Sequence, residues 1–163
     1  RIRPYASRAA SAIAALFRRS VRAIGPRDYT AEQVAAWASA APSPARIEAL
    51  ARDGRTMLVA VDAADRPLAF GDLEPDGHIR FLYCAPEAAG SGVAAMLCAA
   101  LERDARARGV TRLHAAASEA ARRFFLRVGF RVVSRRDFAV AGVPIHNYAV
   151  EKVLAEGCEP NAD

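Results

Sequence analysis

The sequence is poor in the residues and patterns that mark several classes of protein. Only three cysteines occur among its 163 residues and no two form a CxxC pair, so neither a disulfide framework nor a cysteine-based zinc site is predicted. The three histidines share no ligand spacing, and we expect no metal. No apolar run approaches the roughly 18 residues of a membrane span, so no membrane association is expected. Unpaired cysteines suit a reducing compartment, and the expected location is cytoplasmic.

Lysine is almost absent, with Lys152 as the single example, so arginine supplies nearly all the positive charge behind the formal net charge of +5. This excess of arginine has two explanations. It can reflect a compositional bias shared with the abundant alanine, or it can attract a polyanionic partner. No dense Lys/Arg run with interleaved aromatic residues occurs, so nucleic acid is not expected as a partner. A cofactor that carries several phosphates would satisfy the second explanation.

Helices dominate the first third of the chain. After a short edge strand at residues 2–4, apolar residues at helical spacing predict a helix that ends at Gly25-Pro26. A capping box at Thr30–Gln33 opens a second helix, and Ser43-Pro44 opens a third.

Strands follow from residue 57 onward. Runs at residues 57–61, 68–73 and 78–85 read as strands, and Asp76-Gly77 is a hairpin turn signal before the last of them. Their spacing predicts an antiparallel meander.

The second half alternates helices and strands. It predicts a long helix after residue 92, a strand at 112–116, a short helix capped by Ser118, and a hairpin of residues 130–140 and 145–153. The long helix is expected to face inward through Val93, Met96, Leu97, Ala100 and Leu101.

This order of elements predicts an α/β fold. We expect a single domain with a mixed, mostly antiparallel sheet flanked by helices, and with a central strand-helix-strand unit. The domain is assigned to residues 1–154, and residues 155–163 are assigned to a C-terminal tail.

The sharpest local signal for chemistry is Gly90-Ser91-Gly92, which stands between a strand and a helix. Glycine lets the backbone turn and leaves no side chain in the way of a ligand. The free N–H groups and partial positive charge of a helix start bind phosphate. A glycine pair alone is equally typical of a tight connection without a ligand, and its spacing matches neither a Walker loop nor a dinucleotide fingerprint.

Longer segments around this turn resemble the GCN5-related N-acetyltransferase (GNAT) family, and look closest to its bacterial small-molecule type. The family pattern Gln/Arg-x-x-Gly-x-Gly/Ala falls on Ala89–Ala94, with its first position replaced by alanine. An aromatic pair before Gly-Phe matches Phe124–Phe130. The resemblance covers about residues 2–154. Further matches to the bacterial subgroup are Tyr29, Thr30, Gln33, Trp37, Asn147 and Tyr148.

The resemblance implies acetyl-CoA as cofactor and direct transfer of its acetyl group to a primary amine of a small molecule or peptide. Amides of the glycine turn would hold the pyrophosphate, the strand edge would pair with the pantetheine arm, and an N–H near Tyr83 would stabilise the oxyanion. A homodimer is compatible with the family. The implied cofactor-binding residues are Leu82, Tyr83, Cys84, Ala89, Gly90, Ser91, Gly92, Val93, Ala94, Ala95, Ser118 and Phe125. The implied acceptor-pocket residues are Tyr29, Trp37 and Tyr148.

Two departures from the family pattern bear on this mechanism. Ala89 removes a side-chain partner for the phosphates, although backbone amides supply most of such a site. Phe125 stands where many relatives carry a tyrosine that protonates the leaving thiolate, so another acid acts or the thiolate leaves unassisted, since thiols are far more acidic than alcohols. Phe125 and Ser118 also have plain structural readings, as a core residue and a helix cap. A non-catalytic acyl-CoA-binding regulatory module therefore stays open as an alternative.

A general base must deprotonate the acceptor ammonium. The candidates are Asp72, Glu74 and His146, with His78 close to the first two in sequence. Each also has a structural interpretation, because the first two and His78 flank a turn and His146 can be a surface or structural histidine. Cys84 is interpreted as a packed strand residue, since the family attacks directly from the amine.

Overall fold

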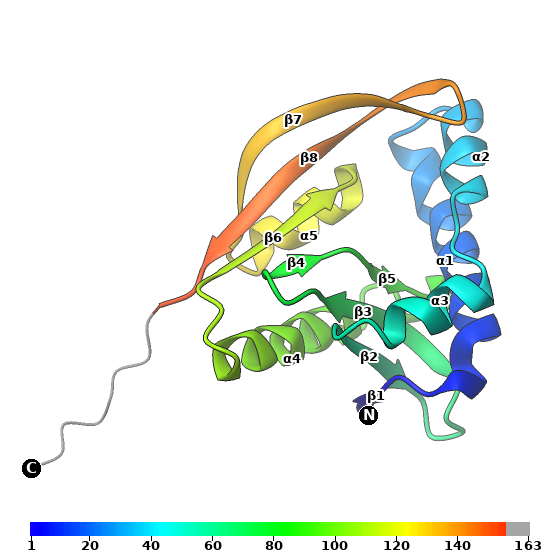
Figure 1. The fold of residues 1–163 in the computed structure, drawn as a ribbon. Helices are drawn as coiled ribbons and strands as arrows, with labels where there is room; N and C mark the ends of the chain where they lie inside the picture. Colours follow the sequence, from blue (N-terminus) through cyan, green and yellow to red (C-terminus); the bar gives the residue numbers. More distant parts are fainter. Residues whose placement is uncertain (156–163) are drawn as a thin grey trace, which may run out of the picture.

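The computed structural model describes residues 1–155, so the expected tail, apart from Ala155, and Cys158 lie outside the described residues. The order of elements agrees with the prediction, except that the third predicted strand is divided (Figure 1). The elements are β1 (Ile2–Pro4), α1 (Ala10–Ile24), α2 (Ala31–Ser39), α3 (Pro44–Ala51), β2 (Thr56–Val61), β3 (Pro67–Leu73), β4 (His78–Ile79), β5 (Leu82–Cys84), α4 (Val93–Ala107), β6 (Arg112–Ala117), α5 (Glu119–Arg127), β7 (Arg131–Val140) and β8 (Val143–Val153).

The strands form two sheets where the sequence predicted one. In the first sheet, β1-β2-β3-β5, every neighbouring pair is antiparallel. In the second, β4-β6-β8-β7, only β4 and β6 run parallel. Because α4 lies in the chain between these two parallel strands, β4, α4 and β6 form the expected strand-helix-strand unit. The α/β class and the mostly antiparallel pairing are confirmed.

The predicted strand at residues 78–85 is divided at the point where a carboxylate binds its backbone. Asp72 Oδ1 accepts hydrogen bonds from the N–H groups of Arg80 (2.9 Å) and Phe81 (2.7 Å). These two donors are therefore taken out of the strand ladder. β4 pairs with β6 through His78 opposite His114, whereas β5 stays beside β3. The two sheets separate along β5 and β6 as a result.

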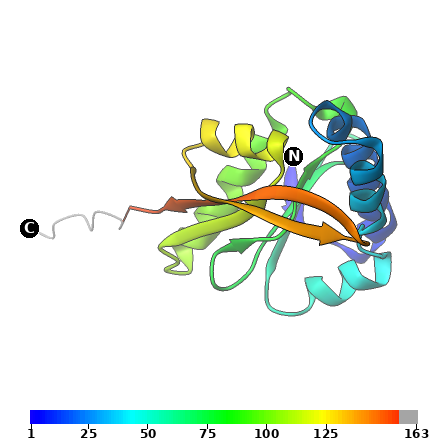
Figure 2. The same ribbon diagram turned by 90° about the horizontal axis from the view of Figure 1, so that it is seen from above.

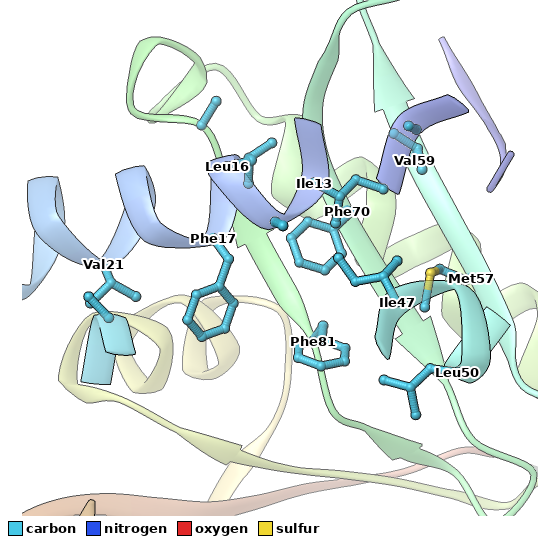
Figure 3. Close-up of a cluster of buried hydrophobic side chains, with 14 of the residues drawn as sticks. Ile13, Leu16, Phe17, Val21, Ile47, Leu50, Met57, Val59, Phe70 and Phe81 are labelled. Atoms are coloured by element: carbon cyan, nitrogen blue, oxygen red, sulfur yellow. The ribbon is translucent and has the colours of Figure 1, made fainter. Parts of the chain in front are cut away.

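The N-terminal helices pack on the first sheet through one apolar face of α1. Figure 3 shows this face against Phe70 of β3. The predicted caps are confirmed: Thr30 and Gln33 exchange side-chain and backbone hydrogen bonds at the start of α2, and Ser43 accepts an N–H at the start of α3. The buried positions of α1 include Ile13, Leu16, Phe17 and Val21, at helical spacing.

The buried face of α4 matches the predicted one only in part: Leu97 and Leu101 are buried as predicted, but the other three predicted residues are not. Met96 is 58% exposed, and Val93 and Ala100 are only half-buried. The reason is that α4 lies against β2 and β3, where Gly71 leaves room for Leu101. The buried residues of α4 are Leu97, Cys98, Leu101 and Ala105.

The β7–β8 hairpin crosses the molecule from the α5 side to the N-terminal helices (Figure 2). Its turn, Ala141-Gly142, has positive φ at both residues (49° and 76°), which is the geometry of a tight hairpin turn. Near its tip, Gln33 Nε2 of α2 donates to the Pro144 carbonyl at 3.0 Å. The hairpin thereby brings β8 beside α2 and α5.

Candidate functional site

A cavity of about 600 Å³ opens where β5 and β6 separate. Its walls come from α1, α2, the strand pair β5 and β6, the start of α4, and α5. Of the residues predicted to bind the cofactor, all except Ser91 line it. The lining residues are Ser20, Val21, Ile24, Trp37, Ile79, Arg80, Leu82, Tyr83, Cys84, Ala88, Ala89, Gly90, Gly92, Val93, Ala94, Ala95, Ala115, Ala116, Ser118, Ala120, Ala121, Phe124, Phe125, Arg127 and Val128.

The glycine turn forms the start of α4 at one wall of this cavity. Gly90 and Gly92 have φ values of 77° and 84°, a left-handed conformation that side-chain-bearing residues rarely adopt. The space beside both α-carbons is open within 4 Å. Ser91 turns its hydroxyl back to donate to the Ala88 carbonyl at 2.6 Å, which explains its absence from the lining. The first N–H groups of α4 are thus presented without a shielding side chain.

One edge of β5 borders the cavity, because β5 is the outermost strand of its sheet. Residues in an antiparallel pair alternate between those that bond to the partner strand and those that do not. Ala85 donates to Leu68 at 2.7 Å and Phe81 accepts from β3 at 3.1 Å. The alternation therefore directs the N–H and C=O groups of Leu82 and Cys84 away from β3. An extended ligand in the cavity would find an unpaired strand edge there.

The side chains of β5 supply apolar surface rather than reactive groups. Tyr83 packs on Phe17 with ring centroids 4.3 Å apart, and burial raises the pKa of Tyr83 to about 12. Burial also raises the pKa of the Cys84 thiol, whose Sγ lies 3.5 Å from the Ala85 carbonyl. A thiol held in its neutral form is a weak nucleophile, which agrees with the interpretation of Cys84 as a packed residue.

The opposite wall is α5, which begins after Ser118. The Ser118 hydroxyl accepts the Ala121 N–H at 3.2 Å and so caps the helix, and the same residue lines the cavity. Phe125 is 3% exposed and packs on Phe130 at a centroid distance of 4.6 Å. Phe125 is thus a core residue that also borders the cavity, and it has no proton to donate.

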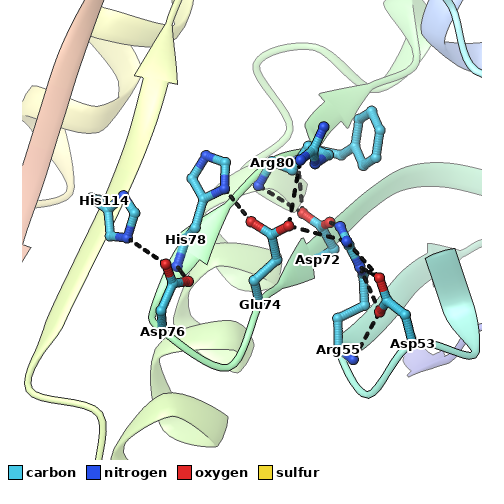
Figure 4. Close-up of polar contacts among 9 residues, drawn as sticks. Asp53, Arg55, Asp72, Glu74, Asp76, His78, Arg80 and His114 are labelled. Carbon is cyan, nitrogen blue, oxygen red and sulfur yellow. Dashed lines mark hydrogen bonds and ion pairs between the residues drawn. The ribbon is translucent and has the colours of Figure 1, made fainter.

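The first two base candidates lie in a separate charged cluster (Figure 4). Neither carboxylate lines the cavity, although Arg80, which contacts both of them, does. Asp72 is fully buried, and its Oδ2 accepts from Arg55 Nη1 at 2.7 Å. Arg55 also binds Glu74 at 3.0 Å, and Glu74 contacts His78 Nδ1. Burial raises the pKa of Asp72, against the opposing effect of backbone N–H donors and Arg55. The structure places both carboxylates at the division between β4 and β5.

The third candidate, His146, lies in a second cluster, centred on a carboxylate at the start of α5. Glu119 Oε1 lies 2.8 Å from His146 Nε2 and accepts from the Tyr148 hydroxyl at 2.7 Å, while Oε2 accepts from Arg122 at 3.1 Å. These bonds, the one to His146 first, lower the pKa of Glu119 to about 2. A carboxylate that accepts from one ring nitrogen fixes the tautomer, so His146 Nδ1 is left as a proton acceptor.

Aromatic side chains connect this second cluster with the cavity. The Tyr29 hydroxyl accepts the Glu119 N–H and donates to the His146 carbonyl, both at 3.0 Å. The Tyr29 ring packs edge-on against Trp37 at 5.7 Å, and Trp37 lines the cavity. Of the three residues predicted for the acceptor pocket, Trp37 therefore reaches the cavity, whereas Tyr29 and Tyr148 lie behind its wall.

Sequence reasoning missed Glu119 and Arg127. Acidic residues are common in the first turn of a helix because they interact favourably with the helix dipole, so the sequence gave no reason to assign Glu119 to the functional site. Its role depends on β8 lying beside α5, which local sequence does not reveal. Arg127 stands in the aromatic segment before Gly129, but only the structure shows that it lines the cavity.

Comparisons with known proteins agree with this geometry. Residues 26–152 match the family model described as an acetyltransferase (GNAT) domain. A GCN5-related N-acetyltransferase from Rhodopseudomonas palustris is 35% identical, with 94% of this chain and 95% of that chain covered and a TM-score of 0.86. A phosphinothricin acetyltransferase from Sinorhizobium meliloti, solved with AcCoA, shares the fold at 19% identity, 97% and 90% coverage and a TM-score of 0.74. None of the curated proteins matches.

The fold, the cavity and these matches define an acetyltransferase of the GNAT class, and the chain belongs to that family. Within it, the chain is an N-acetyltransferase.

Two further observations concern metals and membranes. Across residues 1–155, no group of three or more His, Cys, Asp or Glu side chains is arranged to hold a metal ion. No helix in the same part of the chain is long and apolar enough to cross a membrane.

Proposed function

We propose that this protein moves the acetyl group of acetyl-CoA to the primary amine of a small molecule or peptide by direct attack. The observation that carries the proposal is one cavity with a helix start at one wall and an unpaired strand edge along another. A phosphate-bearing, extended thioester needs both features.

The proposed cofactor contacts follow from the polar groups that border the cavity. Amides of Gly92–Ala95, at the start of α4, would bind the pyrophosphate because their N–H groups have no partner within the helix. The outward N–H and C=O groups of Leu82 and Cys84 would pair with the pantetheine amides. One of the two N–H groups, beside Tyr83, would then donate to the thioester oxygen and stabilise its developing charge.

His146 is the proposed general base, with Glu119 as the residue that positions it. The acceptor ammonium would lose a proton to His146 Nδ1, and the free amine would attack the thioester carbon. The carbon–sulfur bond then breaks, CoA leaves as a thiolate, and the amide nitrogen loses its second proton to the thiolate or to water. Because Phe125 cannot donate a proton, the low pKa of a thiol is what makes this departure feasible.

A matched pair of glycine variants tests the cofactor site. Gly92→Val should weaken acetyl-CoA binding by more than about tenfold, because a side chain at a left-handed position strains the turn and obstructs the amides. Gly54→Val is the control, since Gly54 also has a positive φ (96°) and open space within 4 Å but does not line the cavity. Binding is measured by calorimetry.

The wild-type protein supplies the decisive outcomes. No binding at millimolar acetyl-CoA would overturn the proposal, as would equal losses in the two glycine variants. Tight binding without release of CoA above hydrolysis, across a broad panel of amines and peptides, would instead identify a regulatory acyl-CoA-binding module. The observation that favours this second function is Phe125, which cannot protonate a leaving thiolate.

A further inference from the structure

The three arginines of α5 differ in their partners. Arg122 binds Glu119 at 3.1 Å, and Arg123 binds Asp28 at 2.8 Å. Arg127 makes no ion pair with any residue of the described chain, yet it lines the cavity. A charged side chain at a cavity wall without a counter-ion is a candidate for a ligand contact.

The charges around the cavity have one sign. Among its lining residues are two arginines and no aspartate or glutamate. Arg80 has a carboxylate neighbour, Glu74 at 3.5 Å. Arg127, which is exposed to solvent, is therefore the lining charge without a carboxylate neighbour among the described residues, and the ligand group that fits it is an anion.

The position of Arg127 along α5 indicates which part of a cofactor it would meet. Ser118 caps one end of this helix beside Glu119, whereas Arg127 is the last residue at the other end. At a rise of about 1.5 Å per residue, the helix separates them by roughly 13 Å. His146, the proposed base, lies at the Glu119 end of α5, whereas Arg127 and the glycine turn line the same cavity, so we place the nucleotide half of the cofactor on the side of Arg127.

We propose that Arg127 binds a phosphate of the nucleotide half of CoA, either the ribose 3′-phosphate or the diphosphate. The inference rests on the proposed function. It gives this chain a side-chain charge for the phosphates, which Ala89 at the glycine turn does not provide. Arginine suits the task because its planar guanidinium donates two parallel hydrogen bonds to phosphate oxygens.

Arg127→Ala and Arg103→Ala form the matched test, with Arg127→Lys as the conservative variant. Arg103 is exposed on α4, makes no ion pair within the described residues and does not line the cavity, so its loss changes the net charge alone. Binding of CoA, 3′-dephospho-CoA and pantetheine is measured by calorimetry, after circular dichroism has verified folding. Arg127→Ala should weaken CoA binding by about tenfold, and Arg103→Ala by less than about twofold.

The ligand series identifies the phosphate. A loss seen with CoA but not with 3′-dephospho-CoA assigns the 3′-phosphate, and an equal loss with both but not with pantetheine assigns the diphosphate. Arg127→Lys should keep part of the affinity and show a steeper salt dependence than Arg127→Ala. An unchanged CoA affinity in Arg127→Ala, or an equal loss for all three ligands, overturns the inference. Failure of the wild-type protein to bind CoA would overturn the proposed function itself.

Discussion

Two clusters in this protein contain the same kinds of side chain but do different things. Each joins carboxylate, arginine and histidine side chains. In the first, Arg55 binds Asp72 and Glu74, and Glu74 binds His78. In the second, Glu119 binds Arg122 and His146. In the Asp72 cluster, the carboxylate accepts hydrogen bonds from backbone N–H groups at the division between β4 and β5. In the Glu119 cluster, His146 Nδ1 has no hydrogen-bond partner within residues 1–155, and Ser118, next to Glu119 in the chain, lines the cavity.

The difference lies in what surrounds each carboxylate. Burial dominates at Asp72 and raises its pKa, whereas donors dominate at Glu119 and lower its pKa to about 2. A buried carboxylate that accepts hydrogen bonds from backbone N–H groups stabilises the local backbone conformation, because removing it leaves those donors without a partner. A carboxylate that orients a histidine supports proton transfer. Residue type alone therefore does not separate the two roles.

The largest expected effect is on folding, at Asp72. Asp72→Ala should destabilise the protein by about 3–5 kcal/mol, because it leaves Arg55 and two backbone N–H groups without their buried acceptor. Asp72→Asn should cost less, about 1–3 kcal/mol, since an amide oxygen can still accept the backbone bonds but cannot pair with Arg55. Urea unfolding followed by circular dichroism measures both values.

The turnover rate of Asp72→Asn tests whether the Asp72 cluster is structural and the Glu119 cluster catalytic. A folded Asp72→Asn variant with normal CoA affinity should keep most of its kcat. A loss of about 10²-fold in kcat, with loss of the acidic limb in the pH profile, would make Asp72 the base and reverse the assignment of the two clusters.

The fold was largely predictable because its signals are local. Caps at Thr30 and Ser43 and the apolar spacing in α1 depend only on nearby residues, and each is present in the structure. The division of the third strand was not predictable. It depends on Asp72 binding Phe81, which lies nine positions away, between β4 and β5. The face of α4 was misjudged for a similar reason, since packing against Gly71 decides it.

The candidate site was predictable where the chain itself builds it. The glycine turn and β5 are contiguous in sequence, and their residues line the cavity apart from Ser91. The polar residues at its far end come from separate elements. Glu119, Tyr29 and His146 meet only because the final hairpin returns across α2 and α5. Charge-bearing residues in a sequence thus give candidates, and long-range packing selects among them.

The next effect in size is on catalysis, at His146. His146→Gln should lower kcat by about 10²-fold with little change in the Kd for acetyl-CoA, because it removes a proton acceptor without touching the cavity lining. His114→Gln is the matched control, since His114 stacks on His78 beside the other cluster. Steady-state release of CoA measures both. Equal activity in the two variants would show that His146 is not the general base.

A smaller effect is expected at Glu119, and it depends on pH. Glu119→Gln should lower kcat by about tenfold, since the histidine loses its charged partner. The pKa of Glu119 is about 2 in the folded protein, below the ordinary value of 4.5. The carboxylate therefore stabilises the fold fully above the ordinary value, and this contribution is lost as the pH falls through the folded value.

Measurements of the free energy of unfolding at several pH values test the direction of this pH dependence. The stability difference between wild type and Glu119→Gln should be constant near neutral pH and shrink between about pH 5 and pH 2. A difference that grows on acidification would contradict the low pKa. It would also mean that the donors around Glu119 do not favour its ionised form.

The smallest expected effect is at Tyr148, and it tests the comparison most finely. Tyr148 donates to Glu119, and this bond raises the pKa of the tyrosine, which makes it a weaker acid. If Tyr148 only positions Glu119, Tyr148→Phe should lower kcat by about twofold, because His146 and Arg122 still hold the carboxylate. If Tyr148 were the acid that protonates the leaving thiolate in place of a tyrosine at Phe125, the loss would approach 10²-fold. A thioester with a more acidic thiol would then restore the rate of Tyr148→Phe, whereas a positioning role predicts no such rescue.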